Sequence, residues 1–348
     1  MLFRSEKASV VLVRDGELEV AFRVAIDWTL PEGRSADDKG RSSAMKPYTI
    51  ENTIVLRKGE PWLEITTSLV NNVEDHYLQA VFPSGIRTDT VMAQGQFDVV
   101  ERKIETPDYS KYVETPQAEQ PMNSFVDISD GKAGLALLNE GLKAYTACDD
   151  VARTLCLTLL RCYPLRLCVT SEMIDYSFIE KGSQCLGPHT FRYAVMPHAG
   201  TWEKGGVWRA SERFNLSFRA AQIGPTRHGT EPLTRSFLEL KPDRLHVSAI
   251  KRSESGEGWI VRLFNPFDET IKGSLRLNGG DAGPEKTQSP VERLQAEFAL
   301  PAGRGRKWSK ARIVTLEESP EKDLALRKEG WMNFEIAKKE ILTIEFLP

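Results

Sequence analysis

The stretch RLHVSAIKRSESGEGWIVRLFNP, residues 244–266, decides the fold class of this chain. Apolar residues alternate with polar ones in its first part, a polar segment with two glycines follows, and a second apolar run ends at Asn265 and Pro266. Alternation with a period of two places one face of a strand against a core, and a glycine-containing turn between two such runs is typical of a β-hairpin. The stretch therefore predicts two antiparallel strands.

Similar alternation recurs on the N-terminal side of this hairpin. Residues 17–24 carry apolar side chains at every second position, and in residues 62–69 Leu63, Ile65 and Leu69 share a face. Further strands are predicted for residues 48–56, 77–82, 96–101, 124–128, 135–138, 154–160 and 189–196. Residues 201–214 carry the one apolar stripe of helical type, so we expect a single short helix. Because strands and helices do not alternate, we expect no parallel sheet.

A change of composition in residues 220–236 divides the predicted strands into two groups. This segment is rich in Pro, Gly, Thr and charge and has little apolar periodicity. Shorter strands are predicted after it, at residues 237–240, 245–250, 259–264, 271–277, 291–298, 312–316 and 341–346, with a polar loop at 281–290. A chain of 348 residues exceeds what one core usually serves. We therefore expect an all-β protein: a large antiparallel β-sandwich of the supersandwich kind over residues 1–222, followed by a smaller β-sandwich over residues 223–348.

Composition and charge exclude several classes of partner. The net charge is −3 with both signs interspersed, whereas a nucleic-acid-binding surface normally shows a basic excess. The apolar run at residues 10–13 is too short for a signal peptide or a membrane span, so we expect no membrane association. The five cysteines are odd in number and form no CxxC, which favours reduced thiols and a cytoplasmic location. They are Cys148, Cys156, Cys162, Cys168 and Cys185.

Motifs for catalysis or metal binding are missing from the sequence. None of the five histidines belongs to a His-x-Asp, His-x-His or HExxH pattern, so we expect no zinc site in this chain. His189 and His198 flank one predicted strand, whose length would separate their rings, and we expect them to be hydrogen-bonded structural residues. Cys156, Cys162 and Cys168 recur at every sixth residue, an even spacing that would place them on one face of a continuous strand. Because Pro164 interrupts that strand, buried thiols are the simpler interpretation.

Seven segments in a fixed order carry a resemblance to a known family. They are YLQAVFP at 77–83, GQFDVVER at 95–102, FVDISDGKAGLALLNEGL at 125–142, TLCLTLLR at 154–161, GPHTFRYAVMPH at 187–198, ERFN at 212–215 and the hairpin quoted above. Together they resemble the C-terminal β-domains of family 38 glycoside hydrolases, the zinc-dependent α-mannosidases, of the bacterial, mannosylglycerate hydrolase-like type. Beyond residue 278 the resemblance fades to a general β pattern. Most of the matching positions are architectural: Pro83 and Pro197 end strands, and Gly134 and Gly141 permit turns.

The resemblance implies a function that this chain would not perform alone. Retaining glycoside hydrolysis needs two carboxyl groups at the scissile bond. In the family, the nucleophile and the zinc ligands belong to an N-terminal α/β barrel and a helical segment, which we do not find here. The expected role is therefore the C-terminal β-domain of a retaining α-mannosidase, acting on a mannose-containing saccharide with a catalytic barrel of the same or a separate chain. Zinc is expected in that barrel and no cofactor in this chain.

Two other functions stay open at this point. The chain could be a non-catalytic carbohydrate-binding protein, because β-sandwiches often carry sugar sites on their surfaces. It could also be a module that docks another chain, and a β-domain separated from its barrel should then expose an apolar patch.

The segment at residues 103–122 is long, polar and proline-rich, and it lies between two predicted strands. Loops of this length in compact domains are often functional. It contains Tyr109 and Tyr112, and aromatic rings beside polar groups suit sugar stacking and hydrogen bonds to hydroxyls. We expect Arg102, Tyr109 and Tyr112 to face the barrel or the sugar; a purely structural loop is the alternative.

Overall fold

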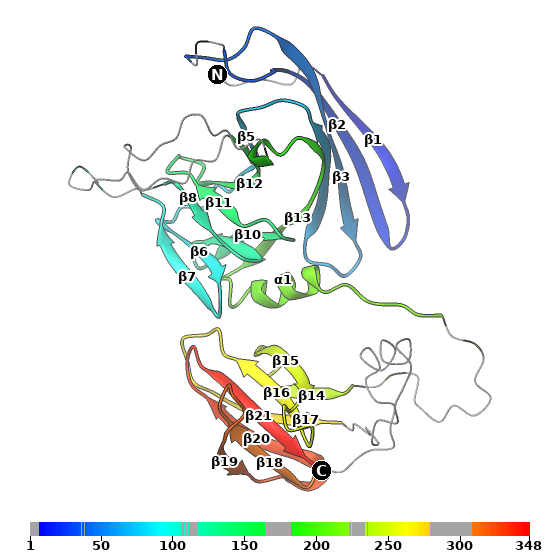
Figure 1. Ribbon diagram of the computed structural model, residues 1–348, viewed down its shortest axis with the longest axis vertical. Helices are drawn as coiled ribbons and strands as arrows, with labels where there is room; N and C mark the ends of the chain where they lie inside the picture. Colours follow the sequence, from blue (N-terminus) through cyan, green and yellow to red (C-terminus); the bar gives the residue numbers. More distant parts are fainter. Residues whose placement is uncertain are drawn as a thin grey trace. The chain divides into compact units, whose positions relative to one another are not determined.

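Antiparallel strands make up both halves of the chain (Figure 1). The computed structural model describes residues 7–35, 37, 39–105, 108, 110, 117–163, 182–222, 224, 234, 236–278 and 308–348. The chain divides into two units, Met1–Phe218 and Arg219–Pro348; the boundary expected from the sequence follows residue 222. Every strand pair in the described ranges is antiparallel, which confirms the predicted all-β class.

Two sheets form unit 1. The nine-stranded sheet has the order β1 (Lys7–Asp15), β2 (Glu19–Pro31), β3 (Met45–Arg57), β4 (Leu63–Asn71), β13 (Gly187–Ala199), β10 (Ala133–Asn139), β9 (Phe125–Ser129), β6 (Thr90–Gly95) and β7 (Asp98–Lys103). The four-stranded sheet has the order β5 (His76–Pro83), β12 (Thr154–Cys162), β11 (Ala144–Ala147) and β8 (Glu119–Pro121). The 3-10 helix η2 (Gly182–Gln184) precedes β13.

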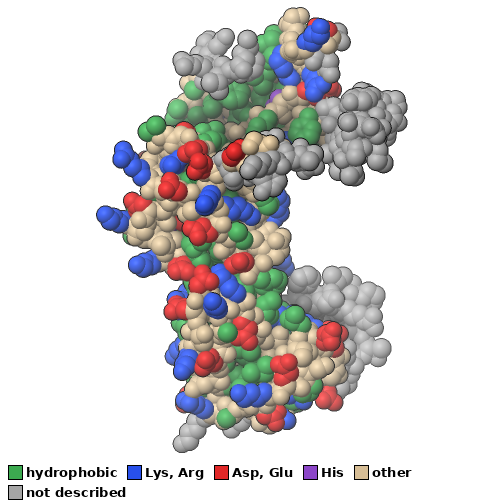
Figure 2. Space-filling model, turned by 90° about the vertical axis from the view of Figure 1, so that its left-hand side faces the viewer, with side chains coloured by type: hydrophobic (Ala, Val, Ile, Leu, Met, Phe, Trp, Pro, Cys, Tyr) green, Lys and Arg blue, Asp and Glu red, His purple; other side chains and the backbone are tan. Residues whose placement is uncertain are grey.

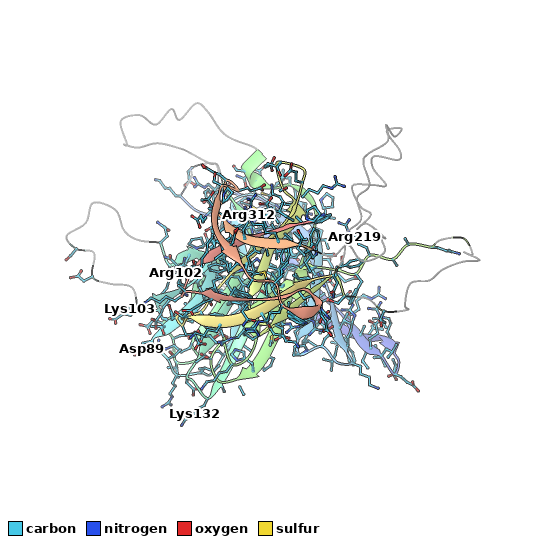
Figure 3. The ribbon with its side chains drawn as sticks, turned by 90° about the horizontal axis from the view of Figure 1, so that it is seen from below. Asp89, Arg102, Lys103, Lys132, Arg219 and Arg312 are labelled. Carbon is cyan, nitrogen blue, oxygen red and sulfur yellow. The ribbon has the colours of Figure 1, made fainter. Side chains whose placement is uncertain are left out.

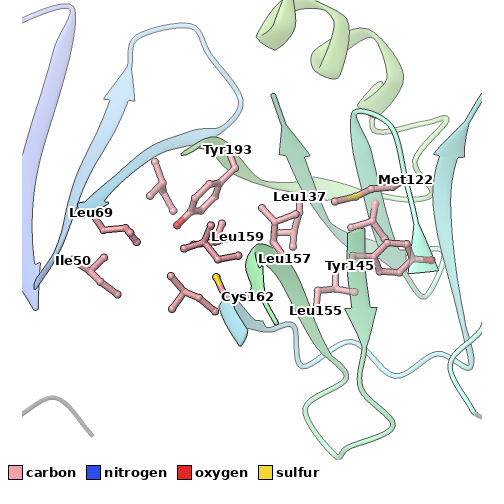
Figure 4. Close-up of a cluster of buried hydrophobic side chains, with 14 of the residues drawn as sticks. Ile50, Leu69, Met122, Leu137, Tyr145, Leu155, Leu157, Leu159, Cys162 and Tyr193 are labelled. Carbon is pink, nitrogen blue, oxygen red and sulfur yellow. The ribbon is translucent and has the colours of Figure 1, made fainter. Parts of the chain in front are cut away.

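The core of unit 1 lies between these two sheets (Figure 4). Leu137 of the larger sheet and Leu155 and Leu157 of the smaller one are fully buried. On β5, Leu78 belongs to this core cluster, whereas its neighbours Tyr77 and Gln79 do not. Successive side chains of a strand point to opposite faces. Tyr77 and Gln79 therefore lie on the outer face of the four-stranded sheet.

The helix α1 (Val207–Asn215) packs on β9 and β10 and is shorter than predicted. Its Trp208 meets the ring of Phe125 edge-on, with ring centroids 6.1 Å apart. The prediction began at residue 201, but the backbone forms turns up to Gly206. Gly206 has a φ of 66°, a left-handed conformation that cannot continue a right-handed helix. The helix therefore begins after Gly206.

Unit 2 also consists of two sheets. The three-stranded sheet has the order β14 (Leu238–Lys241), β17 (Ile271–Leu277) and β20 (Trp331–Ile336). The five-stranded sheet has the order β15 (His246–Arg252), β16 (Trp259–Phe264), β21 (Ile341–Leu347), β18 (Lys310–Val314) and β19 (Pro320–Leu324), and the 3-10 helix η3 (Lys328–Gly330) precedes β20. The predicted hairpin is confirmed, because β15 and β16 are paired. Arg252 pairs with Trp259 next to the turn, and His246 pairs with Phe264 at the other end.

Some strands differ from the prediction for local reasons. The strand expected at 96–101 begins at Asp98, because Phe97 has a φ of 54° and belongs to the β6–β7 turn. No strand is predicted from the sequence at β1, β6, β8, β11, β19 or β20. Of these, β8 has three residues and β19 reads PEKDL without apolar alternation, so neither carries a strand pattern. The strand expected at 291–298 and the loop at 281–290 lie outside the described residues.

Candidate functional site

Arg102, predicted to face a barrel or a sugar, links three strands of unit 1. Figure 3 labels it next to Lys103. Its Nη1 donates to the carbonyl oxygen of Pro121 at 2.8 Å and to Oη of Tyr145 at 3.1 Å. The guanidinium carbon lies 5.9 Å from the centre of the Tyr145 ring. These contacts connect β7 with β8 and β11. Tyr109 and Tyr112 lie outside the described residues, and a sugar-facing role for the three stays a prediction.

Asp127 and His198 form a buried, hydrogen-bonded pair in unit 1. Their Oδ1 and Nε2 atoms are 2.6 Å apart, and the side chains are 0% and 3% exposed. Burial disfavours the imidazolium, but the hydrogen bond and charge of Asp127 outweigh it and raise the pKa of His198. No substrate can reach this pair, so we assign it a structural role. The expectation that His198 is hydrogen-bonded is confirmed.

The other two histidines near the sandwich also have structural surroundings. Nε2 of His189 is 2.6 Å from the carbonyl oxygen of Cys185, which confirms the expected hydrogen bond, and its ring stacks on Phe191 with centroids 5.8 Å apart. His76 packs edge-on against Tyr48 at 5.8 Å. Burial, with a smaller effect of Arg41, lowers the pKa of His76, so its imidazole is neutral at pH 7.

Cys156 and Cys162 are poor nucleophiles. Cys156 and Cys162 are buried, as predicted, and burial raises the pKa of each thiol to about 12. A thiol reacts as its thiolate, so a raised pKa makes both residues inert near neutral pH. Sγ of Cys148 lies 3.7 Å from Sγ of Cys156, and both are free thiols. Cys168 lies outside the described residues.

The family resemblance implies a zinc ion in the catalytic barrel, and the described residues of this chain form no site for one. Within these residues, no group of three or more His, Cys, Asp or Glu side chains could hold a metal ion. In the same residues, no helix combines the length and apolar character needed to cross a membrane.

A polar pocket of about 640 Å³ opens on the outer face of the four-stranded sheet of unit 1. Tyr77 and Gln79 of β5, Glu119 of β8 and Arg161 of β12 form part of its lining. Strand register brings them together, because Tyr77 is the partner of Arg161, and Thr146 on β11 is the partner of Glu119. The sequence does not predict this pocket, because no short motif connects residues of four strands.

Glu119 is the centre of a hydrogen-bond network in this pocket. Its Oε1 accepts from Tyr77 Oη at 2.8 Å and from Thr158 Oγ1 at 2.5 Å, and its Oε2 accepts from Arg161 Nη1 at 2.7 Å. Gln79 Nε2 donates to Tyr77 Oη at 2.9 Å. Burial opposes ionisation of Glu119, but these hydrogen bonds outweigh it and hold the pKa of the carboxyl below its usual range. Glu119 is therefore a fixed, charged acceptor.

Comparison with known proteins identifies the class to which this fold belongs. The model of the glycosyl hydrolases family 38 C-terminal domain matches residues 2–163. The model of the family 38 C-terminal beta sandwich domain matches residues 244–344. The chain therefore belongs to the C-terminal region of the family 38 glycoside hydrolases, which confirms the resemblance inferred from its motifs.

Relatives and a solved structure agree with this assignment. A putative mannosylglycerate hydrolase of Halalkalibacterium halodurans is 26% identical over 235 residues, which cover 66% of this chain and 24% of the relative. Alpha-mannosidase 2C1 of Mus musculus is 28% identical over 208 residues, 59% of this chain and 18% of the relative. An alpha-mannosidase from Enterococcus faecalis V583 has a similar fold, with a TM-score of 0.75 and 21% identity over 97% of this chain and 35% of that one. The chain spans about a quarter or less of the curated relatives it matches.

Proposed function

We propose that this chain is the C-terminal β-region of a retaining, zinc-dependent α-mannosidase. It would support the hydrolysis of mannose-containing saccharides by a catalytic domain that lies outside these residues. Membership of family 38 supports this proposal, as do the names of the relatives. Among the described residues, each of the most buried carboxylates is paired with a basic side chain. Asp127 is paired with His198, Glu64 with Arg57 and Arg192, and Glu345 with Arg312.

The observation that carries the proposal is an exposed apolar surface on β1, β2 and β3. We call it the apolar face; it consists of the exposed Val10, Leu12, Phe22 and Leu56 and the partly buried Val24 and Ile54. Register places these residues on one side of the sheet, since Leu12 pairs with Phe22 and Phe22 with Ile54. Val10 is 64% exposed, Leu56 54%, Leu12 48% and Phe22 41%.

The apolar face is a continuation of the core of unit 1. Ile54 pairs with Ile65, which belongs to the buried cluster, so the same side of the sheet passes from core to surface. In Figure 2, hydrophobic side chains gather near the top of unit 1, while charges of both signs are interspersed over the rest of that unit's visible surface. A contiguous apolar patch on a sheet face marks an interaction site.

The proposed occupant of the apolar face is the family 38 catalytic domain. The matching family models describe C-terminal domains, and the relatives are several times longer than the region they share with this chain. A buried Phe or Leu side chain contributes about 1.5–3 kcal/mol, so two such residues can hold a domain interface.

A chimaeric enzyme tests this proposal. The catalytic part of the Enterococcus faecalis enzyme would be joined to this chain in place of its own matching region, and hydrolysis of an aryl α-mannoside measured. We expect activity in the chimaera and none in the chain alone. The pair Phe22→Ser and Leu56→Ser should lower kcat/KM by about tenfold or more, because each tenfold corresponds to only ~1.4 kcal/mol.

A matched control uses exposed apolar residues on the other side of the same sheet. Val11 and Val70, 52% and 61% exposed, lie opposite the apolar face, and replacing both by Ser should leave the chimaera's activity unchanged. Equal loss in both double variants, or turnover of the aryl α-mannoside by the chain alone, would contradict the proposal.

We further propose that the protein works in the cytoplasm. The odd number of cysteines and the free thiols of Cys148 and Cys156 are in keeping with a reducing compartment. Fractionation of the source cells followed by immunoblotting tests this, and recovery of the protein outside the cytoplasm would contradict it.

A further inference from the structure

We propose that the polar pocket on the outer face of the four-stranded sheet of unit 1 binds a neutral hexopyranoside. This inference goes beyond the proposed function, because it requires no catalytic domain. The pocket volume of about 640 Å³ lies within the range of small-ligand sites, about 300–1,000 Å³.

The hydrogen-bonding groups of the pocket are held in place before any ligand arrives. Glu119 is fixed by Tyr77, Thr158 and Arg161, and Gln79 is fixed by Tyr77. Such preorganisation reduces the entropy lost when a ligand binds. A carboxylate, a primary amide and a guanidinium each present two polar atoms in one plane. Vicinal hydroxyls of a sugar ring can pair with such groups as donors and acceptors.

The charges of the pocket favour a neutral ligand over an ion. Arg34 and Arg161 contribute two positive charges to the lining, and Asp75 and Glu119 contribute two negative charges. Arg161 is already paired with Glu119, and Asp75 Oδ1 accepts from Gln184 Nε2 at 2.7 Å. An ionic ligand would have to displace one of these partners, whereas a hydroxyl group can share them.

Two partly exposed tyrosines supply aromatic surface to the lining. Tyr77 is 46% and Tyr163 37% exposed. The guanidinium of Arg161 lies 5.3 Å from the centre of the Tyr163 ring, which orients both groups. A tyrosine ring combines an apolar body with a polar tip, and this suits a pyranose, which combines C–H groups with hydroxyls.

The groups at the edge of the pocket favour binding over chemistry. Cys162 and His76 both contribute to the lining. Burial raises the pKa of the Cys162 thiol to about 12 and lowers that of His76, so a thiolate does not form near pH 7. A ligand in this pocket would therefore be held without a covalent step.

Isothermal titration calorimetry on the full chain tests the proposal. Methyl α-D-mannopyranoside and methyl α-D-glucopyranoside are the neutral probes, and D-glycerate is the anionic one. We expect a Kd on the order of 1 mM for at least one neutral probe. Gln79→Ala and Arg161→Ala should each weaken that binding by about tenfold, because each removes a polar partner of the sugar.

Two controls separate pocket binding from other effects. Lys272→Ala, on β17 of unit 2 and outside the pocket lining, should leave the Kd unchanged. The melting temperature of each pocket variant should match that of the parent chain, so a loss of binding cannot reflect unfolding. The proposal would be overturned if neither neutral sugar binds, or if only glycerate binds. It would also be overturned if the Kd of the sugar is the same in both pocket variants as in the parent chain.

The same titration distinguishes this inference from the docking proposal. Phe22 and Leu56 lie on the apolar face and outside the pocket lining. The Phe22→Ser and Leu56→Ser pair should therefore bind the sugar as the parent does, even where the chimaera loses activity.

Discussion

The contact between His198 and Asp127 depends on a residue without a side chain. Gly134 of β10 pairs with His198 of β13, while Asp127 of β9 pairs with Ala136. The imidazole must therefore pass over β10 at Gly134 to reach the carboxylate. Gly205 approaches the ring as well, since a Cβ there would lie 2.4 Å from Nδ1 of His198. Two glycines thus make room for a buried pair that joins β9 and β13 across β10.

Replacing Gly134 by Ala should destabilise unit 1. The new Cβ would lie 2.2 Å from Cε1 of His198, so the ring has to move and Asp127 is left buried without its partner. We expect a loss of about 3 kcal/mol, the cost of breaking a buried pair. Urea denaturation followed by circular dichroism measures it.

A matched control for this substitution is Gly95→Ala, also in a strand. A Cβ at Gly95 would have its nearest neighbour at 3.9 Å, an ordinary van der Waals contact. An equal denaturation midpoint for the two variants would contradict the role given to Gly134.

Among the elements, β3, β4 and β13 share one carboxylate. Oε2 of Glu64 on β4 accepts from Arg57 of β3 at 2.8 Å and from Arg192 of β13 at 2.9 Å. The guanidinium of Arg192 also lies 4.0 Å from the centre of the Phe214 ring on α1. Glu64 therefore connects three strands and, through Arg192, the helix.

Glu64→Gln should lower stability in a pH-dependent way. Burial opposes ionisation, but the hydrogen bonds and charges of Arg192 and Arg57 outweigh it and hold the pKa of Glu64 below its usual range. The stabilisation is therefore complete above the unfolded-state pKa of about 4.3 and is lost as pH falls through the lower folded value. Because both arginines are partly exposed, we expect only about 1–2 kcal/mol at pH 7.

Urea midpoints of the parent and Glu64→Gln at pH 7 and at about pH 3 measure this dependence. The difference should shrink at the lower pH. Glu51→Gln is the control, because Glu51 is 47% exposed and lies 3.8 Å from Arg23. A difference that grows at low pH would refute the assignment.

On the scale of the whole molecule, each unit has its own buried core. Phe125, Leu137 and Leu157 are fully buried in unit 1, and Phe264 and Ile344 are fully buried in unit 2. A domain with its own core can fold alone. The two halves should therefore behave as separate folding units.

Expression of residues 1–222 and of residues 223–348 as separate chains tests this expectation. Each should unfold cooperatively on heating, and its circular dichroism transition should match one transition of the full chain. A half that lacks a cooperative transition would show that its core needs the other half.

The alternating pattern alone located many of the strands. The predicted bounds of β16 and β17 coincide with those observed, because Gly258 and Asn265 border the apolar run of β16, and β17 alternates apolar with polar residues up to Asn278. Polar or very short strands such as β8 and β19 carry no such pattern, and they are strands because a neighbour pairs with them. The family could also be predicted from the sequence, because it was identified from seven short motifs that occur in a fixed order.

The candidate sites were decided by tertiary structure. Glu119 and Arg161 are 42 positions apart, and only the order β12–β11–β8 brings them into one pocket. Phe22 and Val20 alternate as core residues do, yet Phe22 is 41% exposed because β1 to β3 extend past the opposing sheet. A sequence determines which side chains share the face of a strand, because successive residues point to opposite sides. It does not determine what covers that face, because burial depends on which distant strands pack against it.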